Sequence, residues 1–415
     1  MESLTLELDE LTANKVFQHL QKLTPFKKIL VAYSGGLDSH VLLHLTSQFS
    51  DCEVRAMHVH HGLQKVADTW VGHCQLVCDD LKIPLNIEYL ELNLDEGKSV
   101  EEVARNARYK ALKELLQKDE VLLTAHHQND QAETLLLQLF RGAGVQGLAA
   151  MPALSTFGFG QHVRPLLAET RESLALYAKE NQLNYIDDPS NQDTAFDRNF
   201  LRNKIIPSLK ARWPSIHKTI SRSAMIQAET KQLLEEVAEQ DLNSVCSEQN
   251  NTLSLSKLSK LSLLRQKLLI RHWISVSGFS APSEKKLKHI FNDVINAVED
   301  AQPLVEWRGV QIRRYQGQLY IMKSLIEHDV KQIIEWNTQE TITIESLKIT
   351  LAALNLDEKE PVTIRFRQGG ESIYLPERGG HHSIKHILHE AKVPPWLRSR
   401  IPLIYRGEKI IKVLF

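Results

Sequence analysis

A glycine-rich turn with one carboxylate lies where the first strong strand pattern of the chain meets a helix pattern. The apolar run ends in "SGGLDS", residues 34–39, and a second apolar run follows it. Two adjacent glycines let backbone N–H groups approach phosphate oxygens, and the start of the following helix adds positive potential. The lysine of a Walker loop is absent, and Asp38 is the charged residue of the turn. A carboxylate reaches phosphate through Mg²⁺, so we expect Asp38 to hold that ion and the turn to capture a leaving pyrophosphate.

Two further strand patterns end in clusters of polar residues. "HVHHG" (58–62) closes an apolar run that starts at residue 53, and "AHHQND" (125–130) closes one that starts at residue 121. In a parallel sheet the carboxyl ends of the strands meet at one edge, which is where ligands bind. We therefore predict an active site built from these two clusters and the glycine-rich turn.

The elements that must position these residues alternate along the first half of the chain. Strand patterns cover 27–33, 53–61, 85–92 and 121–127, with helix patterns between them. This alternation predicts an α/β fold with a doubly wound parallel sheet. A basic helix pattern then ends at Pro214, where we place the end of a catalytic domain, 1–214. We expect a mostly helical domain at 215–325, closing on a strand-like run at 310–322, and a small mixed α/β domain at 326–415.

The composition is that of a soluble protein without a structural metal or disulfide framework. The chain has 415 residues, of which 42% are hydrophobic and 24% charged, and no apolar stretch approaches the length of a membrane helix. Its four cysteines form no C-x-x-C pair. Cys74 and Cys78 lie four apart in a helix pattern, so we expect buried thiols. With an acidic, alternating N-terminus in place of a leader pattern, we expect a cytoplasmic protein.

Charge is distributed unevenly along the chain. The net charge is −1, yet residues 198–231 carry eight Lys and Arg against one acidic residue, and residues 362–415 carry ten against four. Two basic regions on an otherwise acidic chain favour a polyanionic partner that is held at defined places.

Several motifs of the chain resemble one family. "SGGLDS" resembles the loop of the ATP pyrophosphatase (PP-loop) superfamily, a Rossmann-like fold whose members cleave ATP between its α and β phosphates. That loop indicates this cleavage of ATP but does not identify the second substrate. The further motifs resemble the tRNA(Ile)-lysidine synthetase family at both ends of the chain: "HVHHG", "ARNARYKAL" (104–112), "TAHHQNDQAETLLLQLFRGAGVQGLAAM" (124–151), "RPLL" (164–167), "DDPSNQDTAFDRNFLRNKIIPSL" (187–209) and the tail from 365 to 405.

The resemblance implies a ligase that forms a carbon–nitrogen bond in two steps. The wobble cytidine of a CAU anticodon in tRNA(Ile) is adenylated by ATP with release of pyrophosphate, and L-lysine then displaces AMP. Decoding would change from AUG to AUA. The implied ATP-binding residues are Ser34, Gly35, Gly36, Leu37, Asp38, Ser39, His58, His61 and His126, with Asp38 also the metal ligand. The oligomeric state stays open, a homodimer included.

The second step needs a group that handles the proton of lysine. Deprotonating a free lysine amine at pH 7 costs about 4.6 kcal/mol, and the candidates are Asp130, Glu133 and the nearby histidines. Asp130 and Glu133 also have the spacing of a helix capping box. Arg105 and Arg108, three apart on a helix, would either steady phosphate or form a solvated stripe. The family commonly has two adjacent aspartates where this chain has Asn129 and Asp130.

Arginine and lysine side chains in the two basic regions are the candidates for binding tRNA. A solvated helix face is the alternative for the first region. The CAU triplet alone does not separate isoleucine from methionine tRNAs, so a second contact is needed. The candidates are Arg198, Arg202, Lys204, Arg212, Arg365, Arg367, Arg398 and Arg400.

Other functions remain open from the residues alone. A tRNA base thiolase on the same fold would need a reactive cysteine. An amide-forming ligase on the same fold would not account for the two basic regions. A metal-dependent hydrolase would use His126, His127 and Asp130 as ligands, and a binding protein would merely retain the loop.

Overall fold

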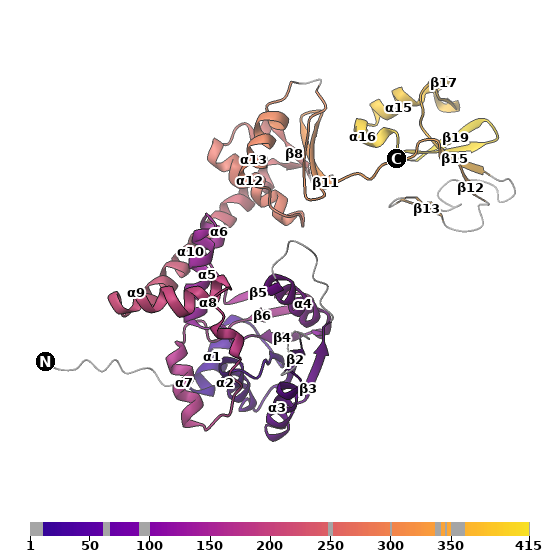
Figure 1. Cartoon of the computed structure of the whole chain (residues 1–415). Coiled ribbons are helices and arrows are strands. Elements are labelled where there is room, and N and C mark those ends of the chain that lie inside the picture. Colours follow the sequence, from indigo (N-terminus) through magenta and orange to yellow (C-terminus); the bar gives the residue numbers. More distant parts are fainter. Residues whose placement is uncertain are drawn as a thin grey trace. The chain divides into compact units, whose positions relative to one another are not determined.

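The computed structural model describes residues 11–60, 67–90, 100–247, 252–298, 301–336, 342–344, 347–349 and 362–414. The chain divides into two compact units, Met1–Glu236 and Val237–Phe415, which Figure 1 draws in the colours of the sequence. Within the described residues, no helix combines the length and the apolar character needed to span a bilayer.

The first unit is built on a six-stranded sheet with the order β3-β2-β1-β4-β6-β5. All neighbouring pairs are parallel except β5 with β6. The predicted doubly wound parallel sheet is therefore confirmed, with an antiparallel edge that the sequence patterns did not show. The strands are β1 (Lys28–Ala32), β2 (Glu53–His60), β3 (Leu85–Tyr89), β4 (Glu120–Leu123), β5 (Leu154–Phe157) and β6 (Gly160–Val163).

Helices cover both faces of this sheet because successive residues of a buried strand point to opposite sides. Ile29 and Val31 of β1 pack into one apolar cluster with residues of α1, α2, α3 and α7, whereas Leu30 packs into another with α4. Figure 1 shows the helices of this unit, with α1 to α4 and α7 around the sheet. They are α1 (Ala13–Leu23), α2 (Leu37–Ser47), α3 (Ala67–Asp80), α4 (Val100–Leu115), α5 (Gln128–Phe140), α6 (Val145–Leu148) and α7 (Arg171–Glu180).

A helical stretch with a widened middle turn follows the sheet. A short 3₁₀ turn, η1 (Pro189–Gln192), leads into α8 (Asp197–Phe200), the π-helical turn η2 (Leu201–Ile205) and α9 (Ile206–Arg212). Pro207 lies just inside α9 and has no N–H to continue the bonding of the preceding turn. The 30-residue helix α10 (Ile216–Val245) comes next.

The described part of the second unit contains two larger antiparallel sheets, besides the two-stranded antiparallel sheets β13-β14 and β16-β17. The first, ordered β7-β8-β11-β10-β9, packs around Trp273 of α12; the second, ordered β12-β15-β18-β19, buries Trp336 and Ile364. The strands are β7 (Cys246–Ser247), β8 (Thr252–Ser254), β9 (Leu304–Trp307), β10 (Val310–Tyr315), β11 (Gln318–Lys323), β12 (Ile334–Trp336), β13 (Ile342–Ile344), β14 (Leu347–Ile349), β15 (Val362–Phe366), β16 (Ser372–Leu375), β17 (Gly380–Ser383), β18 (Pro402–Arg406) and β19 (Lys409–Val413). The helical elements are α11 (Leu255–Leu258), α12 (Leu263–Val276), α13 (Glu284–His289), η3 (Ile290–Ile295), η4 (Pro376–Arg378), α15 (Ile384–Glu390) and α16 (Pro395–Arg398).

The strand-like run at 310–322 is a hairpin and not one strand. Gln316 and Gly317 have φ angles of +46° and +70°, and β10 and β11 pair across them with Tyr315 opposite Gln318. Two successive residues with positive φ make the tight turn that antiparallel strands favour. Segment 215–325 thus contains a five-stranded sheet besides its helices.

The expectation of buried thiols at Cys74 and Cys78 is confirmed. Both side chains have no exposed surface, and burial raises each thiol pKa to about 12. A thiol with such a pKa is a poor nucleophile near neutral pH.

An internal ion pair stabilises the strands that flank β1. The Arg55 guanidinium on β2 donates two hydrogen bonds of 2.7 Å to the Glu120 carboxylate on β4, and Glu120 is 2% exposed. Glu120→Ala would leave the arginine charge without its partner. We expect the free energy of local opening to fall by about 3–5 kcal/mol, measured by hydrogen exchange of the β1, β2 and β4 amides.

Glu53→Ala is the matched control for this change, because the Lys28–Glu53 pair, which joins β1 and β2 of the same sheet, is exposed. It should cost less than about 1 kcal/mol. Equal losses in the two variants would contradict the assignment of Glu120 as a buried structural anchor.

Candidate functional site

The glycine-rich turn joins β1 to α2 and leaves backbone donors at the helix start. Gly35 has a φ of +84°, and a Cβ there would lie 2.7 Å from the Ile186 side chain, so only glycine fits without a shift. Gly36 is the N-cap of α2 and provides no side-chain cap. The first N–H groups of an uncapped helix lack intrahelical partners and are suited to bind phosphate oxygens.

Both serine hydroxyls of the turn form hydrogen bonds within the turn itself. The Ser39 hydroxyl donates to the Gly36 carbonyl (3.0 Å) and accepts from the Ser34 N–H (3.2 Å). Because that uses its only hydrogen, the Ser34 hydroxyl donates to Ser39 across the 3.0 Å between their oxygens. The serines therefore fix the shape of the turn, and the groups they leave for phosphate are backbone N–H groups.

His58 lies beneath the turn. It is 4% exposed, its Nδ1 donates to the Tyr33 carbonyl (3.0 Å), and burial lowers its pKa. This position supports the strand that precedes the turn. His61, the other histidine predicted from this strand end, lies outside the described residues.

The "AHHQND" cluster forms the start of α5, which begins at Gln128, two residues before Asp130, where the apolar pattern of the sequence places the start of the helix. His127 is the N-cap: its Nδ1 accepts the Asn129 N–H (3.2 Å), and its own N–H bonds the Asp130 carboxylate (3.0 Å). A capping box is present, with Asp130 as its third helical residue and not as its cap. The Nε2 of His127 lies 3.5 Å from carboxylate oxygens of both Asp38 and Asp130, so this ring joins the strand end to the glycine-rich turn.

Asp130 and Glu133 form a compact network with two arginines. Arg198 donates to Asp130 (2.8 Å) and to Glu133 (2.7 Å). Arg202 donates to Asp130 (3.2 Å) and to both oxygens of Glu133 (2.7 and 2.9 Å). Burial opposes ionisation of Asp130, but His127 and Arg198 outweigh it and lower its pKa to about 2. Sequence reasoning assigned these arginines to tRNA and missed their contacts with the acidic pair.

Asn129 makes two contacts that use both ends of its amide. Its Nδ2 donates to His217 Nε2 on α10 (3.3 Å), and its Oδ1 accepts the Arg171 N–H at the start of α7 (3.3 Å). An aspartate could not donate to the histidine. The departure from the family pattern at this position thus fits a residue that ties α5 to two other helices.

Arg105 and Arg108 on α4 are cations without an acidic partner among the described residues. Their guanidinium carbons lie 5.1 and 5.6 Å from the centre of the Tyr109 ring, within cation–π range. Burial and the charges of Arg105 and Arg198 lower the pKa of Arg108. Repulsion from neighbouring cations favours an anion at this place.

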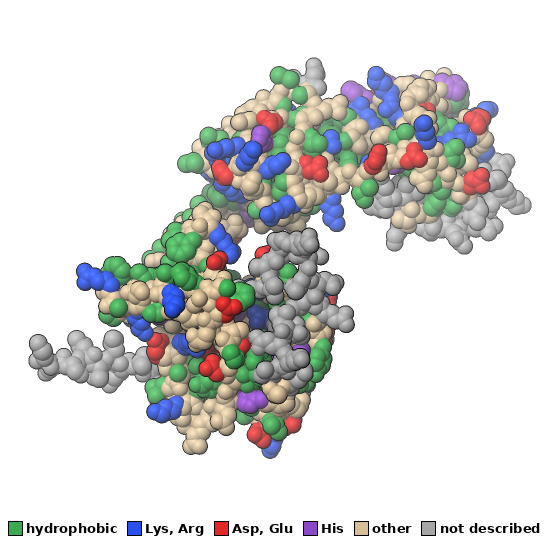
Figure 2. Space-filling model, viewed as in Figure 1, with side chains coloured by type: hydrophobic (Ala, Val, Ile, Leu, Met, Phe, Trp, Pro, Cys, Tyr) green, Lys and Arg blue, Asp and Glu red, His purple; other side chains and the backbone are tan. Residues whose placement is uncertain are grey.

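The remaining side chains predicted to bind tRNA differ in whether they already have an ion-pair or hydrogen-bond partner within the protein. Lys204 and Arg212 are exposed on the π turn and α9. Arg365 pairs with Glu408 (3.2 Å) and Arg367 lies 3.9 Å from Glu371. Arg398 donates to the Val393 carbonyl and to the Tyr315 hydroxyl, both at 2.9 Å, and Arg400 donates to the Ile326 carbonyl. On the face in Figure 2, Lys and Arg side chains are spread over the second unit, with acidic ones among them.

One carboxylate oxygen in the turn fits a metal ion. The Oδ1 of Asp38 is buried and has no hydrogen-bond partner among the described residues. An orphan buried carboxylate oxygen is costly unless a cation or donor satisfies it. The described residues contain no group of three His, Cys, Asp or Glu side chains that could hold a metal by themselves. The donor set therefore suits an ion that takes most of its ligands from phosphate and water, as Mg²⁺ does.

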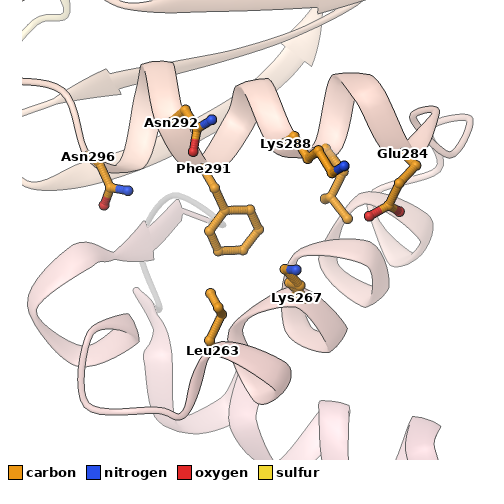
Figure 3. Close-up of a pocket in the computed structure, with 8 residues that line it drawn as sticks. Leu263, Lys267, Glu284, Lys288, Phe291, Asn292 and Asn296 are labelled. Atoms are coloured by element: carbon orange, nitrogen blue, oxygen red, sulfur yellow. The ribbon is translucent and has the colours of Figure 1, made fainter.

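A cavity of about 240 Å³ lies in the second unit and shares no residue with the turn. Figure 3 shows it between α12 and the α13–η3 helix, with Phe291 pointing toward Leu263 and with Lys267, Lys288 and Glu284 at one side. Its lining mixes apolar side chains with Lys, Glu and Asn, and none of its residues belongs to the site around Asp38.

Comparison with protein families matches three segments of the chain. Residues 8–209 match a PP-loop domain. Residues 253–320 match the TilS substrate binding domain, and residues 362–414 match the TilS substrate C-terminal domain.

Curated relatives match the chain over almost its full length. The chain is 42% identical over 415 aligned residues to a tRNA(Ile)-lysidine synthase of Coxiella burnetii, covering 97% of this chain and 92% of the relative. It is 39% identical to a tRNA(Ile)-lysidine synthase of Escherichia coli O157:H7, covering 94% and 92%. A solved structure of the U34-tRNA thiolase NcsA from Methanococcus maripaludis aligns with a TM-score of 0.46 at 22% identity, covering 52% of this chain and 78% of that one.

The level of identity and the coverage of both chains lead to one conclusion. The chain belongs to the tRNA(Ile)-lysidine synthase family.

Proposed function

We propose that this protein ligates L-lysine to the wobble cytidine of tRNA(Ile), with ATP as the activating substrate. The observation that carries the proposal is the similarity to lysidine synthases along 97% of the chain. A PP-loop domain alone is shared by several activities, whereas both substrate domains of the family are present here as well. We further propose that the substrate tRNA has a CAU anticodon and that the reaction takes place in the cytoplasm.

In the first step the PP-loop turn would hold the phosphates of ATP. The N–H groups at the start of α2 have no side-chain cap, and the turn before them is held by the hydrogen bonds of Ser34 and Ser39, so they are suited to bind phosphate oxygens. Asp38 would hold Mg²⁺, which when bound would supply positive charge that neutralises the oxygens of the leaving pyrophosphate. The cytidine carbonyl oxygen would attack the α-phosphate, and we propose that Arg105 and Arg108 balance the charge of that phosphate.

In the second step the acidic pair would hold the lysine substrate. Because its pKa is lowered to about 2, Asp130 is ionised at neutral pH and is a better partner for an ammonium than an acceptor of its proton. Arg198 and Arg202 already occupy both carboxylates. The lysine ammonium would therefore share or displace a guanidinium, and these two arginines would control its access.

Two alternative functions fit the structure less well. A thiolase needs a reactive thiol, and Cys74 and Cys78 are buried with raised pKa values. A hydrolase would need a metal held by His126, His127 and Asp130, but no such group occurs in the part of the chain that the structure describes.

We propose that the tRNA is bound by basic side chains outside this site. Lys204 and Arg212 are exposed and follow Arg198 and Arg202 closely in sequence, and the regions 215–325 and 326–415 would reach other parts of the tRNA. Arg365, Arg367, Arg398 and Arg400 would act there together with the carboxylates and carbonyls that they contact.

Mass analysis of the wobble nucleoside tests the proposed function directly. A CAU tRNA(Ile) transcript incubated with the protein, ATP and L-lysine should gain the mass of lysine less one water. A methionine tRNA transcript with the same triplet is the control and should stay unmodified. A sulfur-bearing nucleoside, or pyrophosphate release without tRNA, would overturn the proposal.

The role of Asp38 predicts a selective loss of chemistry. Asp38→Ala should lower the rate of pyrophosphate release at least about 100-fold, since the turn would no longer hold the metal, while tRNA affinity stays within about twofold. Asp51→Ala, at an exposed aspartate, is the control. Turnover that survives in Asp38→Ala would remove the metal-holding role.

The lowered pKa of Asp130 predicts a pH-dependent contribution to stability. The carboxyl has a pKa of about 2 in the fold against an ordinary value of 3.8, so it stabilises the fold above pH 3.8, by about 2 kcal/mol. That contribution is lost as the pH falls from 3.8 through 2. Urea unfolding of the first unit from pH 5 to pH 2.5 should show a weaker pH dependence in Asp130→Asn than in the wild type. An identical pH dependence would contradict the network, and Asp51→Asn should leave it unchanged.

A further inference from the structure

Four polar side chains form a continuous hydrogen-bonded chain at the ends of β4 and β6. Arg164 Nη2 lies 3.2 Å from His162 Nδ1. His162 Nε2 lies 2.8 Å from the Thr124 hydroxyl oxygen, and that oxygen lies 2.8 Å from His126 Nδ1. Arg164 is itself anchored at the Pro152 carbonyl (2.7 Å). The chain starts in the protein interior and ends at a histidine of the site.

The direction of the first two bonds follows from the chemistry of the groups. A guanidinium has donors only, so Nδ1 of His162 must accept and carries no hydrogen. The ring of His162 is then neutral with its hydrogen on Nε2, which donates to Thr124. Burial and the charge of Arg164 lower the pKa of His162 to about 3, in agreement with a neutral ring.

The direction of the last bond follows from the single hydrogen of a hydroxyl. Thr124 is 6% exposed and has no hydroxyl partner besides the two rings within the described part of the chain. If His126 Nδ1 also carried a hydrogen, the buried hydroxyl hydrogen would have no acceptor, which is unfavourable. Thr124 therefore donates to His126 Nδ1, and the hydrogen of the neutral His126 ring is on Nε2.

The surroundings of His126 indicate what its Nε2–H would meet. The ring is half-buried at the carboxyl end of β4, and burial together with the charges of Arg164, Arg198 and Arg108 outweighs the opposing charge of Asp130 and lowers the pKa of the ring. A neutral N–H donor among guanidinium groups is complementary to an anionic oxygen. A ring nitrogen that already carries hydrogen cannot accept the proton of an amine.

We propose that Arg164, His162 and Thr124 are positioning residues that hold His126 as the neutral Nε2–H tautomer, in which it donates a hydrogen bond to a phosphoryl oxygen of the nucleotide. His126 then takes no proton from the lysine substrate, and this leaves that task to another group. The tautomer rests on the contacts within the protein, whereas the identity of the ligand rests on the proposed function.

Nitrogen NMR of the full-length protein labelled at histidine with ¹⁵N tests the tautomer. The His126 signals, assigned with His126→Gln, should show hydrogen on Nε2 alone in the wild type. Thr124→Val removes the hydroxyl at nearly constant shape and should give a mixture of tautomers or hydrogen on Nδ1. Thr124→Ser keeps the hydroxyl and should restore the wild-type pattern. The wild-type spectrum alone overturns the proposal if it shows hydrogen on Nδ1, even should a variant fail to fold.

Pyrophosphate release measured at saturating tRNA tests the consequence. Thr124→Val should lower kcat/KM for ATP about 10- to 100-fold, the effect of losing one hydrogen bond to a charged group, and Thr124→Ser should retain most of the rate. Thr156→Val, at an exposed threonine of β5, is the matched control. His126→Gln keeps an N–H donor and should be more active than His126→Leu, whereas equally inactive variants would indicate a base.

The two readouts separate this inference from the proposed function. A wild-type Nε2–H tautomer without lysidine formation would overturn the function and its ligand and leave the hydrogen-bonded chain intact. Lysidine formation with hydrogen on Nδ1 of His126 would overturn this inference alone.

Discussion

The pairing of two buried carboxylates with two guanidinium groups is the constraint on which the site depends. Glu133 is 1% exposed, and a carboxylate so placed must be matched by cations and donors. Arg198 and Arg202 provide them from a helical stretch 65 or more residues further along the chain. The network thereby fixes α8 and the π turn against the start of α5. The position of the start of α5, and with it the capping residue His127 beside Asp38, depends on these ion pairs.

In the PP-loop turn, backbone N–H groups are available for phosphate, whereas the charged groups of the site are side chains. Both serines and His58 use their hydrogen-bonding groups to shape the turn, so phosphate binding is left to amides at the start of α2. Charge is handled by side chains on the neighbouring elements. Asp38 has an unsatisfied carboxylate oxygen, and Arg105 and Arg108 of α4 are cations without an acidic partner among the described residues. A site arranged in this way can bind a polyanion together with a cation that neutralises it.

The parts of the fold that sequence patterns predicted are those governed by local periodicity. The parallel strands β1 to β4 and the helices between them follow from apolar runs and amphipathic spacing. Strands β5 and β6 are short and carry few apolar residues, so no pattern marked them. The hairpin of β10 and β11 looked like one strand because its turn, Gln316 and Gly317, interrupts the apolar pattern only briefly. The start of α5 was misplaced because a histidine, an uncommon cap, begins the helix in place of Asp130.

By itself the sequence determined the chemistry of this protein: the "SGGLDS" turn, the clusters at the strand ends and the two basic regions indicated a nucleotide-activating enzyme of one family. These signals are local or depend on the order of motifs, so they are visible without a structure. Only the tertiary structure decided which side chains meet. It paired Arg198 and Arg202 with the acidic pair, tied Asn129 to His217, and linked Arg164 to His126 through Thr124 and His162. Such partners come from distant segments, and their hydrogen bonds depend on atomic positions that no spacing in the sequence specifies.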